Sequence, residues 1–324
     1  MRRLTWGLAA WLLLLVAAQV AAFELIRRVF VATRRGQLLD TVALNGNSIG
    51  QEHIDEVVDV VLSAMTVLSL AAATIVIGFI ALMRRRVALA AAATLLIIGA
   101  NLTTQVLKYA IERPEFGVDL ERVGAGNSLP SGHTTVAASV AVALVLVLPP
   151  AVRGVAGLIG GAYAGLAGVA TLSAGWHRPS DAVASFLVVG VWAAVAGLVL
   201  AIAHHQDRAA GPSPGHRKPL LTLLLVGLVL LAGAGGMMFL TARELAAQPA
   251  WYDQQLLFTA YAGGAAGIVG AASLMMALVL ASVHVAVPPR NGSVSVRQGA
   301  RSEPPTTESA AHEGSPRVAS VAAP

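Results

Sequence analysis

The stretch NSLPSGHTTVAASVAVALVLVLPP, residues 127–150, decides the fold class. Its polar first part ends at His133, and the apolar run Thr134–Leu148 that follows is typical of a membrane helix. Two prolines then end the run, because proline lacks the backbone N–H that a continuing helix needs. Similar apolar runs recur along the chain, several of them about 20 residues long, which is the length needed to cross a bilayer. The sequence therefore predicts an all-α, polytopic membrane helix bundle.

The composition supports the same fold class. Of the 324 residues, 56% are hydrophobic and only 12% are charged, with a mean hydropathy of +0.72, far from the soluble average. The net charge of +5 comes mostly from arginines at the ends of apolar runs and in the tail, which favours contact with anionic lipid headgroups over nucleic acid. The chain has no cysteine, which excludes disulfides, thiolate catalysis and cysteine-ligated metal.

Eight apolar runs predict eight membrane spans, numbered here in chain order. They cover Leu4–Phe23, Val57–Met83, Val87–Leu107, Thr134–Leu148, Gly154–Ser173, Asp181–Ala203, Leu220–Leu240 and Leu256–Val285. A cleaved signal peptide is the alternative for the first run, but the run is long for a signal sequence, so we expect a retained helix. Residues 1–203 are a predicted six-span core, residues 204–287 a linker with two further spans, and residues 288–324 a disordered cytoplasmic tail.

The placement of lysine and arginine predicts the orientation of the chain. With the N-terminus in the cytoplasm, Arg84–Arg86, Arg153 and the basic linker before the seventh span all lie inside. The polar connection Arg27–Glu56, which carries four arginines, then lies outside as an exception to the rule. The loops that contain His133 and His177 both follow odd-numbered spans, so they share one membrane face whichever way the chain is inserted.

Each of these two histidine loops has features that suit an anion. Ser131 is a preferred helix N-cap and Gly132 allows close backbone approach, so the helix start beside His133 would offer N–H donors and a positive dipole to a phosphate. In the second loop, His177 and Asp181 are four residues apart at another helix start, where the carboxylate would orient the imidazole and stabilise its protonated form. Taken separately, an ordinary capped helix and an interfacial histidine are the alternative interpretations.

Taken together, the polar residues on this face have an informative order. Lys108 and Arg113-Pro114 come first, then Pro130–His133, then His177–Asp181. This order resembles the type 2 phosphatidic acid phosphatase superfamily of membrane lipid phosphatases, most closely in the last two segments. The resemblance covers the six spans from Leu4 to Ala203, and it leaves out the last two spans and the tail.

The resemblance implies metal-independent release of phosphate from a lipid phosphate in the bilayer, through a phosphohistidine and without a cofactor. By this resemblance His177 attacks phosphorus, Asp181 orients it and balances its charge, and His133 protonates the leaving oxygen and then activates water. Such a reaction depends mainly on positioning and charge stabilisation. The residues expected to hold the phosphoryl oxygens are Lys108, Arg113, Ser131 and the backbone N–H of Gly132.

Two features of the sequence differ from the family pattern. Only four residues separate Lys108 from Arg113, fewer than in the family, and Glu115-Phe116 stands where a second Arg-Pro would fall. Ala170-Thr171 stands where the family has Ser-Arg before the second histidine. We hypothesise that Arg178, which adjoins His177, or Arg122 replaces the missing phosphate-binding cation, with Arg178 the better candidate.

The sequence thus predicts an integral membrane lipid phosphatase at the extracytoplasmic face of a plasma membrane. An isoprenoid diphosphate, phosphatidate and phosphatidylglycerol phosphate are all compatible substrates. Alternatives are a phosphotransferase that uses the same phosphohistidine, and a catalytically impaired protein that binds lipid phosphates. A metal held by His133, His177 and Asp181 is a further alternative, but the accompanying lysine and arginine favour an anion.

Overall fold

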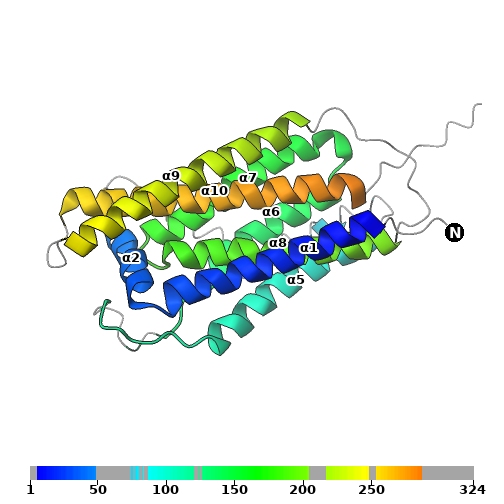
Figure 1. Ribbon diagram of the computed structural model, residues 1–324. Coiled ribbons are helices and arrows are strands. Elements are labelled where there is room, and N and C mark those ends of the chain that lie inside the picture. Colours follow the sequence, from blue (N-terminus) through cyan, green and yellow to red (C-terminus); the bar gives the residue numbers. More distant parts are fainter. Residues whose placement is uncertain are drawn as a thin grey trace, which may run out of the picture. The chain divides into compact units, whose positions relative to one another are not determined.

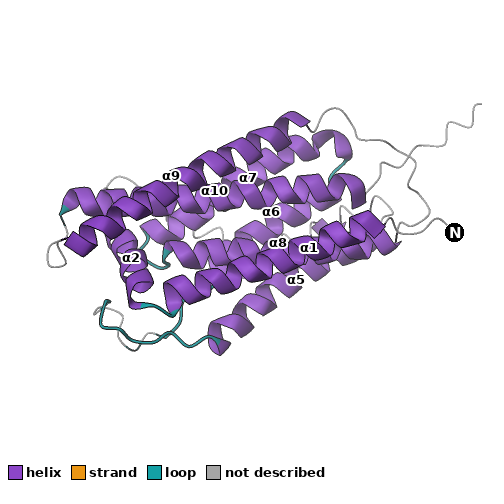
Figure 2. Cartoon of the chain, viewed as in Figure 1, coloured by secondary structure: helices purple, strands orange, loops and turns teal. Residues whose placement is uncertain are grey.

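The computed structural model describes residues 6–48, 74, 75, 77–79, 83, 87–119, 124, 126–203, 217–247 and 253–286. The described secondary structure is helical (Figure 2). Six helical segments in these ranges are long and apolar enough to cross a membrane. They are α1 (Trp6–Ile26) with the π-helical turn η1 (Arg27–Val31), α5 (Val87–Ala110), α7 (Pro150–Ser173), α8 (Pro179–Ala203), α9 (Arg217–Ala247) and α10 (Gln254–Ala286). The predicted all-α membrane bundle is confirmed.

The other two predicted spans differ from these six. The fourth forms α6 (Gly132–Val147), whose 16 residues correspond to about 24 Å, less than the roughly 30 Å of a bilayer core. Most of the second, Val57–Met83, lies outside the described residues. The Arg84–Arg86 triplet, most of the linker before α9 and the tail from residue 288 lie outside them as well.

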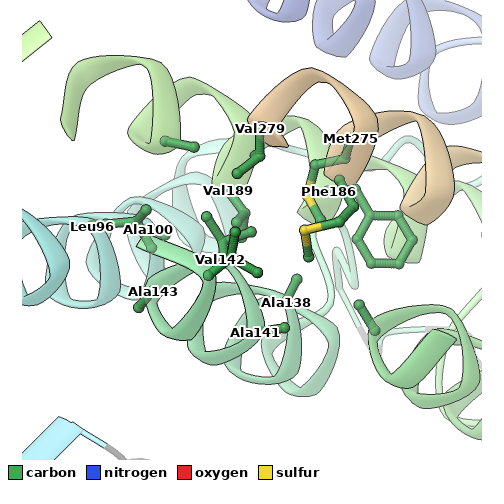
Figure 3. Packing of buried hydrophobic residues seen from close by; sticks show 14 of the residues in the cluster. Leu96, Ala100, Ala138, Ala141, Val142, Ala143, Phe186, Val189, Met275 and Val279 are labelled. Carbon is green, nitrogen blue, oxygen red and sulfur yellow. The ribbon is translucent and has the colours of Figure 1, made fainter. Parts of the chain in front are cut away.

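The short helix α6 is packed inside the bundle. Its Ala138 and Val142 are fully buried and belong to one hydrophobic cluster with residues of α5, α8 and α10 (Figure 3). Glycine makes this packing close: a Cβ added to Gly168 of α7 would lie 2.6 Å from Ile268 of α10. Helix α10 therefore shares a core with α5, α6, α7 and α8, and this core fixes the helix ends that carry the two histidine loops.

The predicted polar connection Arg27–Glu56 is helical over most of its described part. After η1 it forms α2 (Arg34–Asn45) and a 3₁₀ turn, η2 (Gly46–Ser48). Helix α2 begins where the Thr33 hydroxyl caps it by accepting the Gly36 N–H at 3.0 Å. It crosses the end of the bundle at which α10 begins (Figure 1), and its Val42 and Ala43 join a hydrophobic cluster with residues of α9 and α10.

Arg153 lies just beyond the turn between α6 and α7. It belongs to the first turn of α7 and is only 2% exposed. Its Nε donates to the Leu148 carbonyl at 2.9 Å and its Nη2 to the Leu146 carbonyl at 3.3 Å. The side chain thereby satisfies carbonyl groups that the end of α6 would otherwise leave without partners.

Candidate active site

The His177 loop is a tight reversal between α7 and α8. Gly175 adopts a φ of 71°, a left-handed conformation that glycine reaches without steric cost. The backbone N–H groups of Trp176 and His177 both donate to the Thr171 carbonyl, at 3.0 and 3.1 Å. Thr171 stands where the family pattern has arginine, so its observed contribution is to hold this turn through its backbone.

Within this loop, Asp181 fixes the His177 ring. The Asp181 side chain is fully buried, and its Oδ2 lies 3.2 Å from His177 Nδ1. The same oxygen accepts the backbone N–H of Arg178 at 3.1 Å, which holds the carboxylate in place. With Nδ1 directed at the carboxylate, Nε2 is the ring atom left for chemistry. The expected i, i+4 pair is therefore formed.

The His133 loop meets the His177 loop. The two imidazole centroids lie 6.5 Å apart with their planes at 61°, and the His133 centroid is 5.2 Å from the Trp176 ring. Backbone contacts connect the loops, because Ser131 N–H donates to the Asp181 carbonyl at 3.1 Å. Ser185 of α8 reinforces this contact by donating its hydroxyl to the Ser131 carbonyl at 2.8 Å. The two loops share one face, as their placement after odd-numbered spans predicts.

Ser131 acts as the N-cap of α6, as expected. Its hydroxyl accepts the Thr134 N–H at 3.4 Å and the Thr134 hydroxyl at 3.0 Å, and the residue is completely buried. It is not among the residues that line the neighbouring cleft. The contacts of Ser131 thus hold the loop, and binding of a phosphoryl oxygen by its hydroxyl stays a prediction.

A polar cleft of about 360 Å³ opens beside His177. Lys108, from the last turn of α5, and Arg113, from the following loop, both line it. The Arg113 side chain is only 6% exposed, and its Nη2 lies 3.5 Å from Asp181 Oδ1. Its Nε and Nη1 are buried and find no hydrogen-bond acceptor among the described residues. Burial lowers the pKa of this guanidinium from its ordinary value, against the opposing effect of Asp181.

Arg178 also lines the cleft, but its donors are directed at protein acceptors. Its Nη2 pairs with Asp119, its Nη1 donates to the Ser128 hydroxyl at 3.2 Å, and its Nε approaches the Thr41 hydroxyl at 3.5 Å. The side chain therefore joins three segments of chain beside His177. Its role as a substitute phosphate-binding arginine stays a hypothesis, and the rival candidate Arg122 lies outside the described residues.

Sequence reasoning missed the contribution of α2. Asp40 is 3% exposed, and its two carboxylate oxygens accept the backbone N–H of Ser180 at 3.1 Å and the Ser180 hydroxyl at 2.5 Å. Burial, and next the Asp181 carboxylate, raise the pKa of Asp40 to about 6. Gln37, one turn earlier, lines the cleft and donates to the Pro114 carbonyl at 2.9 Å. The sequence signal that could have revealed α2 is the N-cap residue Thr33 followed by an amphipathic pattern.

The described side chains favour an anion as ligand. Among them, no three histidine, aspartate or glutamate residues come together in a way that would hold a metal ion. The cleft is instead lined by Lys108, by Arg113 with its two donors that find no described acceptor, and by the imidazole of His177. The His133 imidazole lies beside His177. This set of groups suits a phosphoryl group, whose oxygens accept hydrogen bonds and whose phosphorus accepts a nucleophile.

Comparison with known families identifies this part of the chain. Residues 87–204 match the family model of the PAP2 superfamily. This segment, a little over a third of the chain, is similar to the PAP2 superfamily. The match runs from the start of α5 to the residue after α8, and it includes the lysine, both histidines and Asp181. The match supports a phosphatase-type membrane enzyme, in agreement with the resemblance seen in the sequence. No curated protein and no solved structure matches the chain.

Proposed function

We propose that this protein is an integral membrane lipid phosphatase that works through a phosphohistidine. The observation that carries the proposal is the meeting of two imidazoles with centroids 6.5 Å apart, one of which, His177, lines a cleft together with Arg113. Asp181 holds one imidazole, and two guanidinium nitrogens of Arg113 have no described protein acceptor. A nucleophile, a second proton carrier and an anion-binding group therefore lie together.

In the first chemical step, Nε2 of His177 forms a bond to phosphorus as the bond to the leaving oxygen breaks. His133, protonated at the start, gives its proton to that oxygen, so the lipid leaves as an alcohol, or as a monophosphate when the substrate is a diphosphate. The phosphorylated His177 ring carries positive charge, which the Asp181 carboxylate at 3.2 Å balances. Proton transfer of this kind typically contributes a 10²–10⁴-fold rate increase.

In the second step, His133 accepts a proton from water while the water oxygen attacks phosphorus. The N–P bond breaks, its electron pair returns to Nε2 of His177, and inorganic phosphate is released. Arg113 and Lys108 stabilise the phosphoryl oxygens during both steps, and the Gly132 backbone N–H at the start of α6 is the expected third donor. No step requires a metal ion.

A lipid substrate is supported by the surroundings of the site. An apolar groove of about 190 Å³ lies between α1, α5 and α8 and is lined by Phe23, Leu107 and Trp192, among others. Leu107 directly precedes Lys108, which lines the polar cleft, so α5 borders both spaces. We propose the headgroup side of the extracytoplasmic face of a plasma membrane as the location, on the basis of the lysine and arginine distribution.

The test is phosphate release by the purified full chain in detergent with a chelator present. A panel of phosphatidate, phosphatidylglycerol phosphate and an isoprenoid diphosphate serves as substrate, and His177→Ala is expected to reduce release by about 10³-fold or more. The matched control is His204→Ala, which removes a histidine that belongs to neither motif. Unchanged release by His177→Ala would refute the phosphohistidine mechanism.

The remaining outcomes distinguish the alternatives. Release only in the presence of an added acceptor alcohol would show a phosphotransferase. Binding of the lipid without release would show a catalytically impaired binding protein. The ion pair of Arg178 with Asp119 favours this alternative, because it occupies a cation that could otherwise bind phosphate. Loss of activity with the chelator would show that a metal takes part.

A further inference from the structure

One face of α2 is polar and buried against the candidate active site. Gln37, Asp40 and Thr41 occupy positions i, i+3 and i+4, so they lie on the same side of the helix, and all three are at most 4% exposed. Gln37 contacts the segment that carries Arg113, through the Pro114 carbonyl. Asp40 and Thr41 contact the turn that carries His177, through Ser180 and Arg178. This face thus touches two of the segments that form the site.

Asp40 makes the strongest of these contacts. The first N–H groups of a helix have no partner within the helix, and Ser180 is the second residue of α8. The Asp40 carboxylate supplies that partner from another helix, and it also accepts the Ser180 hydroxyl. The helix dipole favours a negative charge at this position, whereas burial and the neighbouring Asp181 carboxylate oppose it. The next residue is Asp181, so fixing Ser180 fixes the carboxylate that orients His177.

The opposite face of α2 is apolar and rests on the last two helices. Val42 and Ala43 pack with Leu245 of α9 and with Leu256 and Ala260 of α10. Helix α10 also touches α8 at the same point, because a Cβ added to Gly264 would lie 2.6 Å from Pro179. Pro179 is the first residue of α8, directly before Ser180. Helices α9 and α10 therefore support α2 from behind while α2 holds the start of α8.

We propose that Asp40 is a positioning residue for the His177–Asp181 pair, and that α2, supported by α9 and α10, completes an active site that the family-matched segment does not contain in full. The proposal rests on the proposed function only for its kinetic consequence. Its structural part, that Asp40 orders the start of α8, stands on the hydrogen bonds to Ser180. It assigns a role to three helices outside residues 87–204, namely α2, α9 and α10.

The test compares Asp40→Ala with Asp40→Asn in the purified full chain. Asparagine retains an oxygen to accept the Ser180 N–H and an amide to meet the Ser180 hydroxyl, whereas alanine retains neither. Asp40→Ala should lower kcat for lipid phosphate about 10–100-fold with KM changed less than about threefold, because misplacing a reacting group by about 1 Å costs up to about 10²-fold. Asp40→Asn should recover kcat to within about threefold of the wild type.

Hydrogen exchange gives a second measurement that does not depend on turnover. In Asp40→Ala, exchange should accelerate in peptides that contain Ser180 and remain at wild-type rates in α5, and Asp40→Asn should restore protection. The matched control is Ser282→Ala, which removes a buried polar side chain near the other end of α10, where its hydroxyl accepts the Trp11 indole N–H at 3.3 Å. This control should leave kcat and the exchange of Ser180 unchanged.

Several results would overturn the proposal. Wild-type kcat in Asp40→Ala, or equal loss in the alanine and asparagine variants, would show that the hydrogen bonds of Asp40 do not position the site. Accelerated exchange throughout α5 and α8 would show a general structural role. If the wild type released no phosphate, the proposed function would fail, and exchange at Ser180 alone would decide whether Asp40 orders the turn.

Discussion

Two buried arginines, Arg153 and Arg178, show how the two helix connections of the core differ. Arg153 follows the α6–α7 connection and donates to backbone carbonyls of Leu146 and Leu148, only a few residues away. Arg178 lies in the α7–α8 connection and donates to side chains of Asp119, Ser128 and Thr41, which are 50–137 residues away. The first arginine completes a local helix end, whereas the second joins distant segments around a cleft.

The difference shows where this fold buries charged side chains, whose loss of hydration is unfavourable. A buried charge is stable only when hydrogen bonds compensate for its lost hydration. For Arg153 this compensation comes from carbonyl groups of the kind that any helix end offers. Around Arg178, compensation depends on Asp119, and nearby Asp40, Asp181 and Arg113 are also buried. Such a concentration of buried ionisable groups is characteristic of functional sites.

The largest effect is expected for Arg113, which adjoins Arg178 in the cleft but has donors that no described residue accepts. Arg113→Ala should lower kcat/KM for lipid phosphate about 10²–10³-fold, the usual cost of removing one donor that stabilises a developing oxyanion. Steady-state phosphate release measures this. Arg113→Lys should recover only part of the loss, because a point charge does not reproduce the guanidinium fork.

If Arg113→Ala lost thermal stability along with activity, the contrast between a structural α6–α7 connection and a functional α7–α8 connection would fail. It would mean that Arg113, like Arg153, mainly compensates a neighbouring protein group, in this case Asp181. Melting of the variant in detergent, measured beside the activity, separates these two explanations.

Next in size is a pH effect from Asp40, a group at the same end of the bundle as Arg178. Its folded-state pKa of about 6 exceeds the ordinary aspartate value of 3.8, so the folded chain binds the proton more tightly than the unfolded chain. The Asp40 contribution to stability is therefore greatest at low pH and decreases as pH rises from about 4 to about 6, by about 3 kcal/mol for roughly two pKa units. Above pH 6 the contribution is constant.

Asp40→Asn should remove this dependence while retaining the hydrogen bonds to Ser180. The difference in unfolding free energy between variant and wild type should therefore favour the variant increasingly from pH 4 to pH 6. Thermal unfolding of both proteins in detergent across this range gives the measurement. A difference that does not vary with pH would show that Asp40 does not titrate there.

Six of the eight predicted spans correspond to described helices of membrane length, and for a clear reason. Apolar length alone determines which segments cross a bilayer, so the run Val87–Leu107 predicted α5 to within three residues of its end at Ala110. The counting of spans then placed His133 and His177 on one face, and their centroids lie 6.5 Å apart. Short-range rules also predicted Ser131 as a cap and the spacing of His177 and Asp181.

The sequence did not predict α2 as part of the site. Hydrophobic periodicity finds a helix by its apolar side, and here the side facing the site consists of Gln37, Asp40 and Thr41, which are polar and yet buried. Their partners are Pro114, Arg178 and Ser180, which lie 77–140 residues away. No local rule connects residues at such separations, and for the same reason the pairing of Arg178 with Asp119 was not foreseen.

Arg178 itself should have a smaller effect on catalysis than Arg113, because its donors already have protein acceptors. Arg178→Ala is expected to lower kcat/KM about 10–100-fold by releasing Asp119 and the Ser128 segment from the cleft wall. Unchanged turnover and affinity would reject any role of Arg178 at the phosphate. Asp119→Asn sharpens the comparison, since it keeps a hydrogen bond while removing the charge that competes with phosphate for Arg178.

The smallest effect on catalysis is expected for Arg153, although the side chain is even less exposed than that of Arg178. Arg153→Ala should leave kcat and KM within about twofold of the wild type, because its contacts to Leu146 and Leu148 lie at the opposite end of α6 from His133. Stability should fall by about 1–3 kcal/mol, since buried carbonyls lose their donor. Arg178→Ala should show the opposite pattern, with a large loss of activity and a small loss of stability. Suppose instead that Arg153→Ala and Arg178→Ala reduced activity equally at equal loss of stability. The two connections would then act as one cooperative unit, because α6, a helix of 16 residues, would transmit the disturbance from its end to His133 at its start.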